Sequence, residues 1–203
     1  MRWFRSLLIV SLGFLVLGSA EAGTYSLNLR YQPLKDLSSL QGKIGSTLAM
    51  APFKDERLET LYVGRHTNLE GDVTYFRSDP FPLEKAIQES LPDVLSRHGI
   101  KTIPVSRWDD KPESLKNMET DSVLMIEIKR FWTEGKASLL GTKVKTVMQL
   151  AIHLGVKKEG KVFTRSVEVE KEMTVPRSTP ERVETMMNQM LTEIFDSYFS
   201  NPY

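Results

Sequence analysis

Strict alternation of apolar and polar residues opens the folded part of the chain. In Thr24–Pro33 the side chains alternate with a period of two, which is typical of a half-buried strand. The apolar set consists of Tyr25, Leu27, Leu29 and Tyr31. Lys43–Phe53 is more continuously apolar, which predicts a second strand near the centre of the sheet. Thr60–Ser78 contains two short β-prone runs around the turn-rich stretch HTNLEGD, which predicts a hairpin.

Helical spacing replaces alternation in Asp79–Gly99. Its apolar stripe consists of Leu83, Ala86, Ile87, Leu91, Val94 and Leu95. Pro92 lies inside this stripe and has no amide N–H, so we expect it to kink or divide the helix. Gly99 suits the C-terminal cap of that helix. A strand is predicted over Ile100–Val105, and the polar segment Ser106–Glu119 has room for one helical turn.

Three long strands, joined as a meander, are predicted in the second half of the chain. The inward set of Ser122–Trp132 consists of Leu124, Ile126, Ile128 and Trp132. The inward set of Lys143–Val156 consists of Val144, Met148, Leu150, Ile152, Leu154 and Val156. After a tight turn at Lys157–Gly160, the third strand alternates Phe163, Val167, Val169 and Met173 with Thr164, Ser166, Glu168, Glu170 and Glu172. Those glutamates would form cross-strand ion pairs with Lys143 and Lys145 on the exposed face.

The last apolar pattern, in Ser178–Phe199, again has helical spacing. Ser178 or Thr179 would cap this helix, with Pro180 at its first position. Its apolar face consists of Val183, Met186, Met187, Met190, Leu191, Ile194, Phe195 and Tyr198. The three methionines could line an adaptable groove, but their helical spacing among other apolar residues favours the core.

The order of these elements predicts an α+β fold. We expect a mixed, largely antiparallel sheet with two main helices packed on one face. No repeat, low-complexity tract or linker divides the chain, so residues 23–203 are expected to form a single domain. The first strand, Thr24–Tyr31, could pair between chains if it lies at an edge, which leaves the oligomeric state open.

The first 22 residues predict export. Two arginines precede the apolar run Ser6–Gly18, and Ala20–Ala22 forms a small-x-small cleavage motif before Gly23. A membrane-spanning helix needs about 20 residues, so the run is short for an anchor, although an uncleaved anchor is the alternative. The chain contains no cysteine, which excludes a lipid anchor on cysteine, disulfides and thiolate chemistry. We therefore expect a soluble, periplasmic protein cut before Gly23.

The charge balance excludes two classes of partner. The whole chain has 27 basic and 26 acidic residues, and removal of residues 1–22 leaves 25 of each. Nucleic-acid binding requires a clustered basic surface, and anionic lipid attracts polybasic segments. A balanced mature chain therefore predicts neither a nucleic-acid-binding protein nor a polybasic membrane binder.

Candidate catalytic residues are few. His66, His98 and His153 lie far apart and lack metal-ligand spacing. His98 suits a helix C-terminus, His66 falls in a turn, and His153 is expected on the exposed side of a strand. The stretch GKIGST is not a phosphate loop, because Leu37 stands where the motif requires glycine. We therefore expect no catalytic, metal or cofactor site.

Interaction candidates come from two tryptophans and one strand end. Trp108 lies in a polar loop without an evident core role, and Trp132 is the second candidate for a partner contact. The strand end APFKDER, Ala51–Arg57, is the densest local signal. Asp55 could accept backbone donors there while Arg57 pairs with a carboxylate, which favours a structural role over a catalytic one.

Several of these segments resemble a known family. APFKDER, YVGR with the later NLEGDVTYF, and DPFPLEKAIQESLPDVLSRHGIKT are similar to the YajG-like group of small envelope lipoproteins and to auxiliary lipoproteins of ABC-type envelope transport systems. DSVLMIEIKRFW, the long hairpin and the final helix extend the resemblance over almost the whole mature chain. It implies a compact periplasmic domain that binds or supports envelope components without known catalysis. The matching positions, with structural roles, are Pro52, Phe53, Asp55, Arg57, Gly64 and Gly99. Because the lipid cysteine is missing, this chain would diffuse freely or be held by a partner.

Three functions remain. The leading hypothesis is a non-enzymatic accessory or binding module of an envelope assembly or transport system, which presents its exposed sheet face and flanking loops to a partner protein. The alternative is a carrier of a small apolar ligand, such as a lipid, held between sheet and helices, with Pro92 marking a helix that opens. The third is a hydrolase that uses Asp55, Asp79 or Asp109 in a cleft.

Overall fold

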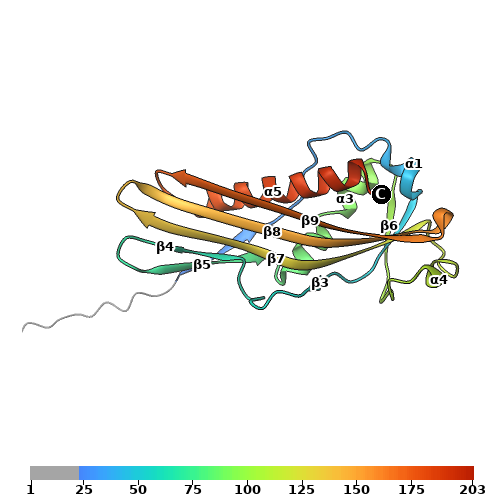
Figure 1. Ribbon diagram of the computed structural model, residues 1–203, viewed down its shortest axis with the longest axis horizontal. Coiled ribbons are helices and arrows are strands. Elements are labelled where there is room, and N and C mark those ends of the chain that lie inside the picture. The colour runs from blue at the N-terminus through green and yellow to red at the C-terminus, as the bar shows by residue number, and fades with distance from the viewer. Residues whose placement is uncertain (1–22) are drawn as a thin grey trace, which may run out of the picture.

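The computed structural model describes residues 23–203, so the predicted signal peptide, residues 1–22, lies outside the described residues (Figure 1). The strands are β1 Thr24–Asn28, β2 Thr47–Met50, β3 Lys54–Asp55, β4 Gly64–Thr67, β5 Val73–Asp79, β6 Lys101–Pro104, β7 Ser122–Ser138, β8 Gly141–Val156 and β9 Lys161–Val175. The helices are α1 Leu40–Ile44, α2 Leu83–Glu89, α3 Pro92–Arg97, α4 Pro112–Leu115 and α5 Pro180–Ser200. A 3₁₀ turn, Lys157–Glu159, joins β8 to β9.

One strand, the 17-residue β7, organises the sheet (Figure 1). Along one edge it pairs antiparallel with β8, and β9 continues the sheet beyond β8. Along its other edge it pairs in parallel with three short strands in turn, β2, β3 and β4. The sheet extends through β6 beyond β2, and through β5 and β1 beyond β4. The described residues therefore form a mixed α+β fold whose longest ladders are antiparallel, as the sequence predicts.

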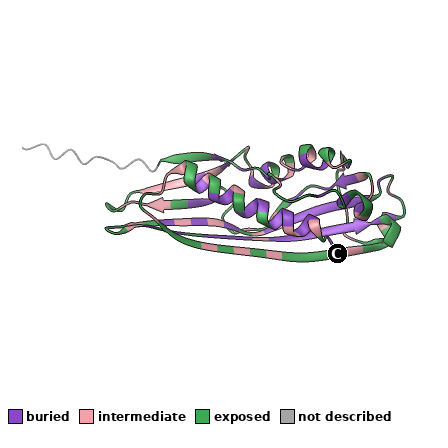
Figure 2. Ribbon diagram, turned by 90° about the horizontal axis from the view of Figure 1, so that it is seen from above, coloured by how far each residue is buried: buried purple, intermediate pink, exposed green. Residues whose placement is uncertain are grey.

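The main helices cover one face of the sheet (Figure 2). Here α5 packs against β1, β8 and β9, while α2 and α3 pack against β5 and β6. Leu124, Ile126 and Ile128 of β7 point into this main core, where Met187 and Met190 of α5 are completely buried. The methionines of α5 are thus core residues, as their spacing predicts. No helix within residues 23–203 is both long and apolar enough to cross a membrane.

The opposite face carries a smaller cluster at one end. It consists of Ala49, Ala51, Leu115, Val123 and Met125, with Val105, Trp108, Met118 and Val162 packed against it. The segment that contains α4 covers this cluster and contacts β8. The rest of this face, formed by β7, β8 and β9, carries the exposed charged residues of the three strands. We call this part the open face.

Polar side chains of α5 take over the backbone hydrogen bonding where β1 ends. The acceptors are Glu184, Asn188, Thr192 and Asp196, and the donors are the backbone N–H groups of Asn28, Arg30, Gln32, Leu34 and Lys35. Because the acceptors are four residues apart, they form one stripe along the helix. The helix thereby supplies partners that a neighbouring strand would otherwise offer. Strand β1 accordingly ends at Asn28, whereas the burial of Leu29 and Tyr31 continues the predicted alternation.

Most of the other predicted elements are confirmed. The hairpin within 60–78 is β4 and β5, and the polar segment 106–119 holds the single turn α4. Pro92 divides the helix predicted over 79–99, because α3 begins at this residue. The cap of α5 is Thr179, whose Oγ1 accepts the N–H of Arg182 at 3.4 Å, and Pro180 is the first helical residue.

Three predictions for the N-terminal third are wrong in part. His66 was expected in a turn, but it belongs to strand β4. Lys43–Phe53 is not a strand throughout, because Lys43 belongs to α1. Leu40 and Ile44 lie one turn apart and are both buried, and Gly45, at φ +89°, separates this turn from β2. Tyr25 was expected on the inward face, but 51% of its surface is exposed, since β1 is an edge strand that pairs only with β5 in the described sheet.

Candidate functional site

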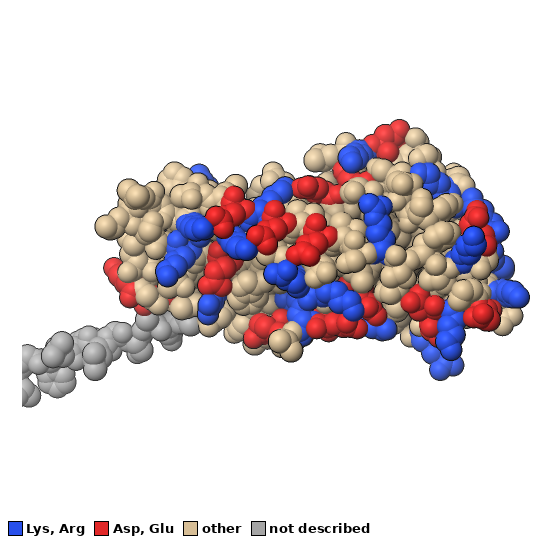
Figure 3. Space-filling model, viewed as in Figure 1, with Lys and Arg blue, Asp and Glu red and all other residues tan. Residues whose placement is uncertain are grey.

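The open face of the sheet carries interleaved charges (Figure 3). The predicted cross-strand pairs are confirmed for two glutamates, with 2.8 Å between Lys143 and Glu172 and 2.7 Å between Lys145 and Glu170. Glu168 pairs with Arg130 of β7 instead, at 2.9 Å. Each lysine reaches diagonally, because the residue opposite Lys145 in the register is Glu172. These side chains are roughly half exposed. Solvent screening therefore limits each pair to about 0–1 kcal/mol, so this face is balanced in charge without being rigidly held by it.

Trp132 lies on the open face, contrary to the prediction that it points into the core. A register shift between Ile128 and Arg130 marks a β-bulge in β7. The extra residue reverses the alternation, so Phe131 takes the buried position and is 1% exposed. The Trp132 indole N–H donates to Glu134 at 3.1 Å.

A cleft of about 400 Å³ surrounds this tryptophan. Its lining comprises Arg57, Leu58, Glu59, Lys129, Arg130, Phe131, Trp132, Glu134, Lys145 and Val147. Leu58 stands at the edge of the cleft and is fully exposed. An exposed leucine beside a half-buried tryptophan, surrounded by charged groups, has the composition of a protein-binding hot spot.

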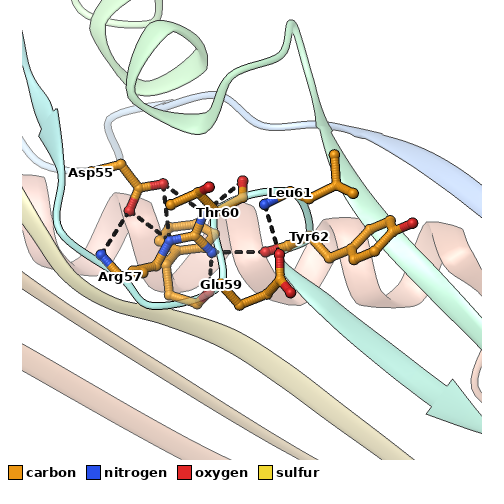
Figure 4. Close-up of polar contacts among 7 residues, drawn as sticks. Asp55, Arg57, Glu59, Thr60, Leu61 and Tyr62 are labelled. Atoms are coloured by element: carbon orange, nitrogen blue, oxygen red, sulfur yellow. Dashed lines mark hydrogen bonds and ion pairs between the residues drawn. The ribbon is translucent and has the colours of Figure 1, made fainter.

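The loop that bears Leu58 is held by an internal ion pair, shown in Figure 4. The Arg57 guanidinium binds the Asp55 carboxylate in a bidentate way, with 2.8 Å from Nε to Oδ1 and 2.7 Å from Nη2 to Oδ2. Both side chains are nearly inaccessible, at 5% and 6% exposed. Glu59 closes the loop further, because its Oε1 accepts the N–H of Leu61 at 2.8 Å.

Arg57 also fills a gap in the sheet. Pairing of β3 with β7 ends near Ile128, and pairing of β4 with β7 resumes at Thr133. Between these points Arg57 Nη1 donates to the carbonyls of Phe131 at 2.9 Å and Tyr62 at 2.8 Å. A buried carbonyl without a partner costs free energy, so the guanidinium replaces the missing strand hydrogen bonds. The bulge and the Arg57 loop together position Trp132 and Leu58.

The other positions of the resemblance lie near strand and helix ends. Phe53 is buried in the main core, while Pro52 lies in a separate cleft beside α2. Gly64 packs directly against Thr133, where an added Cβ would overlap the threonine. Gly99 has φ +74° after α3, and its carbonyl accepts a hydrogen bond from Gln41 at 2.9 Å. Their structural role in the resemblance stays a prediction.

Trp108 lies away from the Trp132 cleft. It packs against the smaller cluster beside Gly155, and its indole N–H donates to Ser114 at 3.0 Å. The loop therefore gives Trp108 a packing role that its polar surroundings in the sequence do not indicate. A partner contact at Trp108 stays a prediction.

His153 is buried rather than exposed, because the Trp108 loop folds over it. Its Nδ1 lies 2.9 Å from Asp110 Oδ2 and 3.0 Å from Thr164 Oγ1, and its surface is 8% exposed. Glu127 is 3.5 Å from Nε2. Lys129 binds Glu127 at 2.8 Å, and this hydrogen bond lowers the pKa of the Glu127 carboxyl.

The acids proposed for hydrolysis have separate surroundings. Asp55 is bound by Arg57, whereas Asp79 ends β5 opposite Asn28. Asp109 accepts the N–H of Lys111 at 3.3 Å, and a hydrogen bond with Ser114 lowers the pKa of its carboxyl. Within residues 23–203, no group of three histidines or acids is placed to hold a metal ion.

A second groove runs between α5 and β9. It has a volume of about 640 Å³, and its lining comprises Leu34, Lys35, Val167, Glu168, Val169, Lys171, Gln189, Thr192, Glu193, Asp196 and Ser197. Most of these residues are polar or charged, but their apolar atoms form the larger part of its walls. Between sheet and helices, where the apolar ligand was predicted, buried side chains such as Met187 and Ile194 pack together, and a ligand there stays a prediction.

Comparison with known proteins finds similarity in the fold, not in the sequence. No protein-family model matches it, and no curated protein sequence is similar to it. Protein XCC0632 from Xanthomonas campestris, of the DUF330 family, is 14% identical with a TM-score of 0.53, over 88% of this chain and 93% of that one. CT253 from Chlamydia trachomatis is 10% identical with a TM-score of 0.40, over 75% and 96%. Lipoprotein GNA1162 from Neisseria meningitidis is 14% identical with a TM-score of 0.36, over 74% and 98%. The likeness to XCC0632 shows a common fold, and membership of the YajG-like group stays a prediction.

Proposed function

We propose that this protein is a non-enzymatic component of the bacterial cell envelope that binds a partner protein through its open face. The observation that carries the proposal is the cleft around Trp132, with Leu58 fully exposed at its edge. Tryptophan and arginine are enriched among residues that dominate protein–protein binding. In a partner complex, Leu58 and Trp132 would be the buried centre and the charged pairs around them the polar rim.

The way the cleft is built favours binding over catalysis. The Arg57 guanidinium hydrogen-bonds Asp55 and two backbone carbonyls. It therefore supports the loop instead of facing a substrate. Arg65 and Glu134, 2.9 Å apart, form a neighbouring exposed pair that could exchange partners with charged groups on another protein. The open face thus offers a preorganised apolar centre and an adaptable charged rim.

The predicted export signal supports a periplasmic location for this interaction. We propose a small envelope protein related to the YajG-like group and to transport auxiliary lipoproteins, without their lipid cysteine. An envelope assembly or transport component would then be the partner. Such binding would also keep a chain without a lipid anchor at its site of action.

Site-directed photocrosslinking in intact cells tests the proposal. A photoreactive amino acid at Leu58 or Lys145 is expected to capture one defined envelope protein, whereas the same probe at Thr185, on the exposed side of α5, captures none. Trp132→Ala should weaken capture from Leu58. Loss upon Trp108→Ala but not Trp132→Ala would move the contact to the Trp108 loop.

Failure of both probes to capture a protein would refute binding at the open face. Native mass spectrometry of the purified protein then tests the alternative, carriage of a small apolar ligand such as a lipid. A copurifying ligand would support the carrier, and its absence would count against it.

A further inference from the structure

Three leucines at one end of the molecule are exposed to solvent. Leu139 and Leu140 form the two-residue turn between β7 and β8, and they are 94% and 95% exposed. Leu69, in the turn between β4 and β5, is 62% exposed. Tight hairpin turns favour glycine, asparagine and other polar residues. Two adjacent leucines at this position therefore contribute nothing evident to the turn itself and call for another explanation.

The two turns lie side by side. Strands β4 and β7 run parallel, with Thr67 opposite Lys136, so the chain leaves the sheet at the same end in both. A shallow cleft of about 490 Å³ is lined by residues of both hairpins, including Leu69 and Ser138. Tyr25 of β1, half exposed, lines the same cleft. Figure 1 shows both turns at one end of the long axis. We call this end the leucine tip and define it by Leu69, Leu139 and Leu140.

The described chain begins at the same end. The carbonyl of Gly23 accepts the N–H of Tyr75 at 2.8 Å, and Thr24 stands opposite Tyr75 in the register. The 22 residues before Gly23 include the apolar run Ser6–Gly18 of the predicted export signal, which engages a membrane before cleavage. If the predicted export signal is cut before Gly23, the leucine tip would be the end of the domain next to the membrane at cleavage.

Charge contributes little at the leucine tip. Lys143 pairs with Glu172 at 2.8 Å, and Asp72 accepts a hydrogen bond from Asn68 at 2.9 Å. Lys136 and Arg177 add exposed positive charges near the turns, and Glu70 and Asp72 add exposed negative ones, so these charges balance. Figure 3 shows mostly uncharged atoms on the end next to the grey segment, whereas charged side chains crowd the opposite end. Any attraction at the tip must therefore be mainly apolar.

We propose that the leucine tip inserts into the interfacial region of a lipid bilayer and holds the molecule with its long axis pointing away from the membrane. Two narrow turns are far smaller than the roughly 800 Å² that each partner contributes to a standard protein interface. A bilayer needs no shape complementarity and accepts small apolar protrusions. The proposal goes beyond binding at the open face and leaves that face free for a protein partner.

Single-cysteine labelling tests the proposal, because the chain has no cysteine of its own. The exported protein carrying Leu140→Cys is labelled with a nitrobenzoxadiazole fluorophore and mixed with vesicles of phosphatidylethanolamine and phosphatidylglycerol. We expect its emission to rise and shift to the blue on mixing. The matched control, Leu58→Cys, labels an equally exposed leucine on the open face and should not respond.

Flotation of the unlabelled protein with the same vesicles measures the contribution of the leucines. We expect Leu139→Ser/Leu140→Ser to lower the partition into vesicles by about tenfold or more, because two apolar side chains no longer leave water. The control Leu34→Ser/Leu58→Ser removes similar exposed apolar surface elsewhere and should float like the unaltered protein.

Three results would overturn the proposal. They are an unresponsive label at Leu140, equal flotation of the tip variant and the unaltered protein, and a vesicle-free dimer that the tip substitutions dissociate. The last result would make the tip an interface between copies of the chain. None of these outcomes affects crosslinking from Leu58, so failure here is distinguishable from failure of the proposed partner binding.

Discussion

Replacing Arg57 by lysine tests whether the Asp55–Arg57 pair holds the loop beside the Trp132 cleft. Lysine keeps the positive charge but loses the planar fork that binds both carboxylate oxygens at 2.8 and 2.7 Å. A single ammonium on that stem cannot also reproduce the hydrogen bonds to the carbonyls of Tyr62 and Phe131. At least one buried acceptor is then left without a partner.

The expected loss of stability follows from the burial of the Asp55 and Arg57 side chains. An unpaired buried acceptor costs about 1–3 kcal/mol, so we expect Arg57→Lys to lower the free energy of unfolding by about 2 kcal/mol. Arg57→Ala also leaves the Asp55 charge uncompensated and should cost about 3–5 kcal/mol. With a urea m-value of about 2 kcal/mol/M, the lysine variant would unfold at a midpoint about 1 M lower.

Urea unfolding followed by circular dichroism provides the measurement, and Arg65→Lys provides the control. Arg65 binds Glu134 in a bidentate way, at 2.9 and 3.1 Å, but these side chains are 46% and 39% exposed. The same substitution there should change stability by less than about 1 kcal/mol. Equal effects at the two arginines would refute the argument that burial and the bound carbonyls give Arg57 its role.

Two further predictions concern packing and pH. Gly64→Ala should lower the free energy of unfolding by about 1–3 kcal/mol, because the new Cβ overlaps Thr133. Gly42→Ala is the control, since open space surrounds this residue, and it should not lower the stability. Equal urea midpoints for the two variants would contradict this prediction. Burial raises the pKa of Tyr198, and burial with Asp196 nearby raises that of Tyr31, above the ordinary 10.0. Above about pH 10 the unfolded chain releases these protons while the folded chain keeps them, so stability falls as pH rises. Tyr31→Phe/Tyr198→Phe should flatten this fall in unfolding titrations, and an unchanged slope would contradict the assignment.

Periodicity in the sequence predicts the fold class and the long elements. In β7–β9 the alternation extends over many residues and one face is buried, so the pattern has one interpretation. The final helix is equally clear, since its apolar stripe, its cap Thr179 and Pro180 all agree. Local pattern and tertiary packing coincide in these elements, which is why they could be predicted.

The candidate site could be predicted only in part. Trp132 was a candidate from the sequence, but its orientation depends on the bulge after Ile128, and a bulge adds one residue without a signature in the pattern. Leu58 was missed because one leucine in a polar loop carries no periodicity. Arg57 was expected to pair with a carboxylate, whereas its bonds to Tyr62 and Phe131 depend on how three strands align along β7.

Short elements could not be predicted from the sequence for a related reason. Helix α1 has only five residues, too few to show a helical period. The hydrogen bonds from the N-terminal segment to Asn188 and Asp196 join residues about 160 positions apart, which no local pattern can show. His153 is buried by a loop that the strand pattern around it does not include.

Cysteine protection at Leu58 in intact cells tests the central claim, that the open face binds a partner protein, most directly. The Leu58→Cys variant is treated with a membrane-impermeant maleimide in cells whose outer membrane has been made permeable, and again after purification. Thr185→Cys reports exposure on the far side of the molecule. We expect labelling at Leu58 to be much slower in cells than in the purified protein, with no such difference at Thr185. Equal labelling of Leu58→Cys in both settings would contradict the account.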